Sequence, residues 1–93
     1  MTLGEVECIE WDEGNSDHVS RRGITYSEVA EVVATAFVQV RLRRSGEPRY
    51  KVIGFGKGGA CLSIVFAYDE RRRALRPITG WATTQADRTK YLG

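Results

Sequence analysis

The sequence has few of the residues from which metal sites and disulfide frameworks are built. Its 93 residues include two cysteines, Cys8 and Cys61, and one histidine, His18. Two thiols and one imidazole do not complete a tetrahedral zinc site, and a secreted domain of this size usually carries more cysteines. We therefore expect no metal centre and no disulfide, and we interpret both thiols as buried strand residues.

Long apolar runs are also missing. No stretch approaches the roughly 20 residues that a membrane helix needs. Residues 1–5 lack the basic start and the apolar segment of a secretory signal. The length fits one domain, residues 1–93, whose small core must use most of the apolar side chains. We expect a single cytoplasmic domain.

The charges are unevenly divided along the chain, although the net charge is only +2. Residues 1–36 hold eight acidic side chains against Arg21 and Arg22, whereas residues 37–93 hold twelve basic side chains against four acidic ones. A basic region of this kind favours a polyanionic ligand. The alternative is an ordinary solvated surface, and charge alone does not choose between the two.

Two helices are predicted after a short strand at residues 6–11. The first runs over residues 13–22, between Asp12 as N-cap and Gly23 as a stop. The second begins with a capping box, in which the Thr25 hydroxyl accepts from the third helical amide and Glu28 reaches back. Apolar residues at helical spacing then run from Val29 to Ala36.

From residue 37 the apolar period changes to two. Strands are expected at 37–42, 49–55, 60–68 and 75–81, followed by a helix from Thr83 or Thr84 to Leu92. The third of these strands is apolar on both faces and should be central. Pro77 cannot donate to a ladder, which favours a sheet edge or a bulge there. The short connections predict an α+β fold with an antiparallel meander.

The segment 54–59 matches the dinucleotide-binding pattern G-x-G-x-x-G by letter. That fingerprint requires a helix after the glycines, whereas a strand follows here. We interpret the segment as a hairpin turn with Lys57 at its tip, available to a phosphate, and we expect no cofactor.

His18 is the only histidine of the chain, and histidine is the residue type whose ordinary pKa lies nearest neutrality. It shares a helical face with Asn15 and Arg22. In one interpretation His18 exchanges a proton and Arg22 binds a phosphate. In the other, which the residues favour, Asn15 and His18 are buried and fix the helix through hydrogen bonds to the backbone.

Cations gather on the later strands, where guanidinium groups suit phosphate oxygens. They are Arg41, Arg43, Arg49, Lys51, Arg73 and Arg76. Aromatic residues lie among them, and some are candidates for base stacking, although most are needed for the core. These are Tyr50, Phe55, Tyr68, Trp81 and Tyr91.

In this order and spacing, the motifs resemble those of BrnT-type toxins. The opening is carried by residues 9–12, Asn15, His18, residues 22–25 and residues 28–29. The hairpin is carried by residues 52–54, Gly59 and residues 62–65, and the close by residues 76–82, Asp87, Arg88 and Tyr91. Two positions depart from the family pattern: Arg22 replaces a common histidine, and Trp81 replaces a common arginine.

The resemblance implies a RelE-like fold, with two N-terminal helices, a four-stranded antiparallel sheet plus a short N-terminal strand, and a C-terminal helix. It implies an endoribonuclease toxin of a type II toxin–antitoxin system that inhibits translation. It also implies a cognate ribbon-helix-helix (BrnA-like) antitoxin, through which alone the protein would reach DNA.

The preferred hypothesis is RNA cleavage without a metal ion, in which a ribose 2′-hydroxyl attacks its own phosphodiester. The expected catalytic residues are His18, Arg76, Arg88 and Tyr91. The expected RNA-binding residues are Arg22, Arg49, Lys51, Lys57 and Trp81. The alternatives are an inactive RNA- or antitoxin-binding module of the same fold, and a basic face that binds only an acidic protein.

Overall fold

The computed structural model describes residues 6–42 and 48–92. Its elements are β1 (Cys8–Ile9), α1 (Glu13–Arg21), α2 (Tyr26–Thr35), β2 (Val38–Leu42), β3 (Arg49–Phe55), a 3₁₀ turn (Lys57–Gly59), β4 (Cys61–Asp69), β5 (Ala74–Ala82) and α3 (Gln85–Leu92). The α+β class and the predicted order of elements are confirmed. Within the described ranges no helix is long and apolar enough to cross a membrane.

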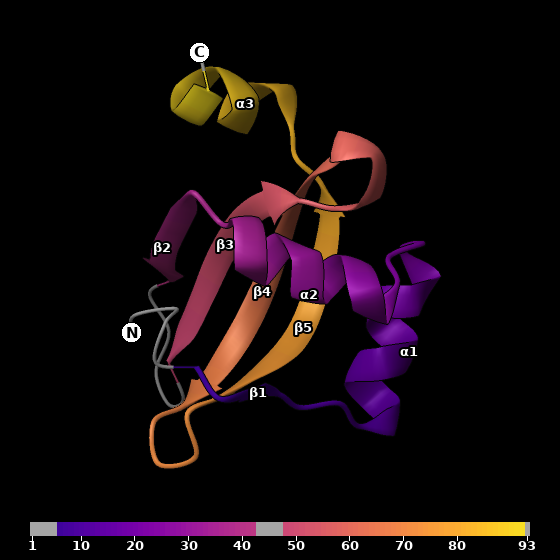
Figure 1. Cartoon of the computed structure of the whole chain (residues 1–93), viewed down its shortest axis with the longest axis vertical. Helices are drawn as coiled ribbons and strands as arrows, with labels where there is room; N and C mark the ends of the chain where they lie inside the picture. Colours follow the sequence, from indigo (N-terminus) through magenta and orange to yellow (C-terminus); the bar gives the residue numbers. More distant parts are fainter. Residues whose placement is uncertain (1–5, 43–47, 93) are drawn as a thin grey trace.

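The strands form one sheet in the order β1-β5-β4-β3-β2, with α2 across one face and α1 beside β5 (Figure 1). The prediction of a four-stranded antiparallel sheet with a separate short strand is wrong in its strand count. β1 joins the same sheet and runs parallel to β5, so the sheet has five strands and is mixed. The Glu7 amide donates to Arg73 and the Glu10 amide to Leu75, which fixes this pairing.

Pro77 occupies β5 without costing a ladder bond. The Leu75 carbonyl faces β1, so the nitrogen of Pro77, two residues further on, also points away from β4. The pairing of β4 with β5 shifts between Val65 and Phe66, because Val65 lies opposite Thr79 and Phe66 opposite Pro77. Ile78 is therefore the extra residue of a β-bulge, as the proline predicted.

Local signals place both N-terminal helices. Gly23 follows α1 with φ of 76°, a conformation that favours glycine over other residues. The capping box of α2 is present, since the Glu28 amide donates to the Thr25 hydroxyl at 3.2 Å and the Thr25 amide to the Glu28 carboxylate at 3.2 Å. Ile24 and Val29 on either side are buried.

The core lies between α2 and the sheet. Val19, Val29 and Val32 from the helices meet strand residues that include Phe66 and Leu75. Gly54 lets α2 approach β3, because a Cβ at this position would lie 2.4 Å from the Val32 carbonyl oxygen. The prediction that β4 is central is confirmed, since all of residues 61–68 are buried.

α3 is attached differently from the other helices. None of its residues is buried, and in Figure 1 it stands beyond the end of the sheet at which β3 and β5 finish. The Thr84 hydroxyl accepts from the Asp87 amide at 3.2 Å, which makes Thr84 the N-cap. Lys51 Nζ lies 3.0 Å from Asp87 Oδ2 and ties the first turn of α3 to β3.

Candidate functional site

The face of the sheet opposite α2, here called the open face, carries two arginines in one row. Ala67 on β4 is paired with Arg49 on β3 and with Arg76 on β5. Paired residues project to the same side of a sheet, so the two arginines flank the small alanine. Their backbones lie two strand spacings apart, about 10 Å, which two long side chains can bridge.

α1 completes a groove beside this row. Its wall is formed by Asp12, Gly14 and His18, and the sheet contributes Arg49, Arg76 and Ile78. The groove is open to solvent and has a volume of about 360 Å³. It brings together three residues that the sequence proposed separately, namely His18, Arg49 and Arg76, from elements far apart in the chain.

His18 is exposed, whereas its neighbour Val19 is fully buried. The interpretation of His18 as a buried residue that fixes the helix is therefore wrong for this residue. The structure does not describe the side chain of Asn15. A solvent-accessible imidazole on the wall of a groove is instead placed to exchange a proton with a bound ligand.

Asp12 and Arg76 form a loose ion pair across the groove, with Nη1 and Oδ2 4.0 Å apart. The side chains are 56% and 41% exposed respectively, and exposed pairs of this kind contribute at most about 1 kcal/mol. A phosphate that offers two oxygens to the guanidinium can displace such a contact. With Arg49 and Arg76 against Asp12, the groove favours an anion.

Lys51 and Trp81 lie on the open face but in other rows. Lys51 is two residues from Arg49 on the same side of β3, and Trp81 is paired with Ser63. Lys51 is engaged with Asp87, so its charge is partly neutralised. Trp81 is half-buried. Both side chains lie on the same face of the sheet as the groove, but neither lines the groove.

The other predicted site residues lie elsewhere. Lys57 is exposed at the tip of the β3–β4 connection, whereas Arg49 begins β3, so six residues or about 20 Å of strand separate them. Arg22 is exposed just after α1. On α3, Arg88 is exposed and Tyr91 half-buried, and neither lines the groove.

Several of the predicted cations and aromatic residues are unavailable to a ligand in the groove. Tyr50 and Tyr68 are buried and pack edge to face, with ring centroids 6.5 Å apart. Arg41 is paired with Tyr50 and so projects to the α2 side of the sheet. Arg73 pairs with Glu7. Arg43 lies outside the described residues. Cys8 is exposed, so the expectation that both thiols are buried is wrong for this one, whereas Cys61 is buried.

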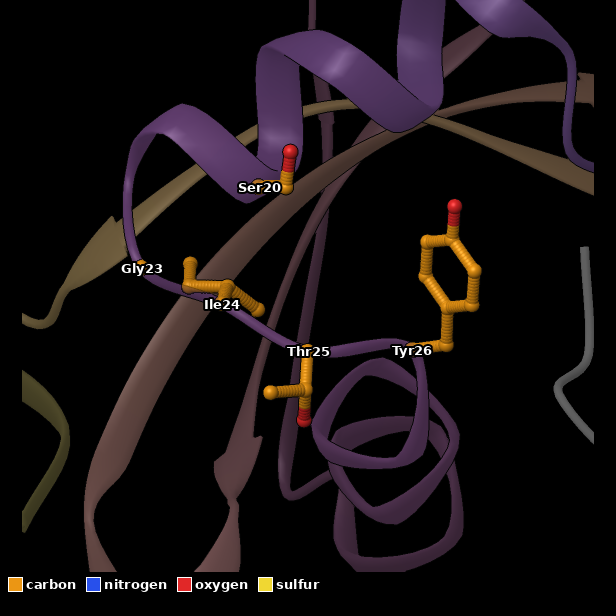
Figure 2. A pocket seen from close by; sticks show the side chains of 5 residues that line it. All are labelled: Ser20, Gly23, Ile24, Thr25 and Tyr26. Atoms are coloured by element: carbon orange, nitrogen blue, oxygen red, sulfur yellow. The ribbon is translucent and has the colours of Figure 1, made fainter.

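A second depression of about 370 Å³ lies where α1 meets α2. Figure 2 shows its lining, with Tyr26 projecting from the start of α2 toward the α1 side and Ile24 between them. The lining consists of Ser20, Gly23, Ile24, Thr25 and Tyr26. It contains neither a cation nor a carboxylate, so it does not suit a phosphate.

Sequence reasoning missed three residues of the groove, Asp12, Gly14 and Ile78. From the sequence Asp12 is only a helix cap, although it belongs to the motif at residues 9–12. Ile78 reaches the groove because it is the bulge residue. A proline in a strand predicts a bulge nearby but does not say which neighbour becomes the extra residue.

Among the described residues, no group of three or more histidine, cysteine, aspartate or glutamate side chains gathers in a way that could hold a metal ion. No family model matches the chain, and no curated protein is significantly similar to it.

Proposed function

We propose that the protein is a metal-independent endoribonuclease, the toxin of a type II toxin–antitoxin system with a BrnT-like, RelE-like domain. The observation that supports this proposal is the single groove lined by His18, Arg49 and Arg76. An imidazole opposite two guanidinium groups is a combination that suits phosphodiester cleavage.

In the proposed reaction the ribose 2′-oxygen attacks the adjacent phosphorus and the bond to the 5′-oxygen breaks. The products are a 2′,3′-cyclic phosphate and a 5′-hydroxyl. Arg49 and Arg76 bind the phosphate oxygens, where negative charge develops in the transition state. His18 accepts the proton of the 2′-hydroxyl, and the departing oxygen takes one from water or from a second acid.

The residues of α3 are left out of this chemistry. The sequence favours Tyr91 as an alternative proton donor, because a phenol holds its proton at neutral pH. Because Arg88 and Tyr91 lie outside the groove's lining, the proposal gives the chemistry to His18, Arg49 and Arg76. Lys51 and Trp81 remain candidates for the flanking nucleotides on the open face.

The test is RNA decay by the purified protein in EDTA. We expect cleavage that leaves cyclic phosphate ends and a rate that falls roughly 10- to 100-fold in Arg76→Gln and in Arg49→Gln, because each loses a charge-assisted hydrogen bond of about 1.5–3 kcal/mol. The matched control is Arg41→Gln, which removes an exposed arginine from the opposite side of the sheet. Equal rates in all three variants would remove the groove from the mechanism.

In cells, Arg76→Ala should relieve any growth arrest caused by the protein without unfolding the domain. Arg76 is only half-buried, so its removal leaves the core intact. Circular dichroism of the purified variant checks that the fold is retained.

A second candidate is a non-catalytic module that binds RNA or an antitoxin. Trp81 on the open face favours it, since the resembling family commonly has an arginine there. Salt-sensitive RNA binding without cleavage supports this module, because phosphate contacts release counterions. Binding that RNA does not compete for would instead indicate an acidic protein ligand.

The proposed partner is a ribbon-helix-helix antitoxin of the BrnA type. Its binding to the toxin would block cleavage and bring the pair to DNA. Co-expression with the product of the adjacent reading frame should yield a stable complex without nuclease activity. Failure of any neighbouring product to bind would argue against the toxin–antitoxin assignment.

A further inference from the structure

A small cavity lies next to the groove and shares one wall with it. It has a volume of about 100 Å³ and is partly open to solvent, so a base would enter it by one edge. Arg76 lines both the cavity and the groove, so the guanidinium group stands between them. A nucleotide with its phosphate in the groove would therefore bring its base to this cavity.

The floor of the cavity consists of two alanines. Ala67 pairs with Arg76, and Ala74 pairs with Asp69, so all four project to the open face. Both alanines are 1% exposed. Their short side chains leave room between the polar walls, and because both alanines are covered, a ligand would contact the walls and not the alanines.

The walls are polar and balanced in charge. Glu10 and Asp69 contribute carboxylates, and Arg72 and Arg76 contribute guanidinium groups. Glu10 and Arg72 form an ion pair. The groove next to the cavity has more cations than anions and therefore favours an anion. The cavity has two of each, so it favours a neutral ring with both donors and acceptors.

We propose that this cavity is a nucleobase subsite that takes guanine, in the nucleotide whose phosphate lies in the groove. This inference rests on the proposed RNA substrate. Guanine presents two adjacent donors, N1–H and the N2 amino group, which match the Glu10 and Asp69 carboxylates as acceptors. It also presents the O6 and N7 acceptors, which match a guanidinium group. The other three bases do not present both pairs.

Asp69 is the more rigid of the two carboxylates. Its Oδ1 accepts from the Arg71 amide at 3.0 Å and from the Arg72 amide at 3.2 Å, which fixes the side chain in the β4–β5 turn. Both bonds use the same oxygen. Asp69→Asn can therefore keep the turn, with the amide oxygen in place of Oδ1, while it presents an NH₂ donor where the carboxylate presents Oδ2.

The test is titration of the purified protein with the four ribonucleoside 5′-monophosphates, followed by the amide NMR signals of Ala67 and Ala74. We expect GMP to bind at least tenfold more tightly than the others, the selectivity that one bidentate base contact gives. Asp69→Asn should lose this preference, and Glu10→Gln should weaken it. The matched control is Asp17→Asn, which alters an exposed ion pair on α1 and should keep the preference.

Equal affinity for all four nucleotides, or a GMP preference that survives Asp69→Asn, would overturn the subsite. Amide signals of Arg71 and Arg72 that are the same in the Asp69→Asn variant and in the wild type establish that the turn is retained. Because mononucleotides are bound without being cleaved, the result does not depend on nuclease activity. A GMP preference with no RNA decay would support the subsite and remove the nuclease, whereas decay without base preference would do the reverse.

Discussion

Breaking the ion pair between Lys51 and Asp87 is expected to loosen α3 while the sheet stays folded. The charged atoms lie 3.0 Å apart, and the side chains are only 20% and 22% exposed. At an effective dielectric constant of about 20 their attraction is about 5.5 kcal/mol. Most of this is offset by the desolvation of both groups. Exposed pairs keep at most about 1 kcal/mol, so we expect a net coupling of about 1–2 kcal/mol here.

The coupling is measured by a double-mutant cycle with Lys51→Met and Asp87→Asn. The cycle is needed because Asp87 also lies in the first turn of α3, where a carboxylate stabilises the helix by itself. The observable is hydrogen exchange of the α3 amides. Loss of about 1–2 kcal/mol raises the population of the opened helix roughly 5- to 30-fold.

The control is the pair formed by Arg21 and Asp17. It has the same separation, 3.0 Å, but its side chains are 77% and 60% exposed and both belong to α1. A pair four residues apart on an exposed helix contributes about 0.3–0.5 kcal/mol. If the two cycles give equal coupling energies, burial does not strengthen the Lys51–Asp87 pair and the account of how α3 is held is refuted.

Three further predictions concern stability and are checked by thermal unfolding. Gly54→Ala should destabilise by about 1–3 kcal/mol, because its Cβ would lie 2.4 Å from the Val32 carbonyl oxygen. Gly14→Ala, which meets nothing closer than 3.4 Å, should instead stabilise α1 by up to about 1 kcal/mol, and the same sign for both would contradict the packing argument. Thr25→Ala should lower the melting temperature by roughly 4–8 °C, since it removes the hydroxyl that caps Glu28 and costs about 1 kcal/mol.

The elements that were predicted correctly are those whose signals are local. The capping box at Thr25 and Glu28 requires four neighbouring residues, and the strand over residues 49–55 has the bounds expected from its alternation. The sheet membership of β1 was not predictable in this way. Cys8 pairs with Ala74, 66 residues later, and two residues carry too little pattern to specify a partner.

The residue types of the candidate site were predictable from the sequence. Which of these residues lie together in one groove was predictable only in part. His18, Arg49 and Arg76 share a groove because α1 packs beside β5 and because Ala67 separates the two arginines. Lys57 and Arg49 lie on adjoining segments of the sequence, yet a whole strand separates them. Their separation in space follows from the length of β3, because Arg49 begins the strand and Lys57 lies just beyond its end.

The bulge at Ile78 determines which side chains of β5 face the same side of the sheet. In a regular strand Arg76, Ile78 and Gly80 would share one side, but the extra residue puts Arg76, Thr79 and Trp81 there together. Deletion of Ile78 would leave these three side chains facing as they do now. Deletion of Gly80 would instead turn one end of the strand over, so that Trp81 would face the other side of the sheet. β5 could therefore lose Ile78 and keep Arg76, Thr79 and Trp81 on one side of the sheet, although the groove would lose one apolar side chain from its lining.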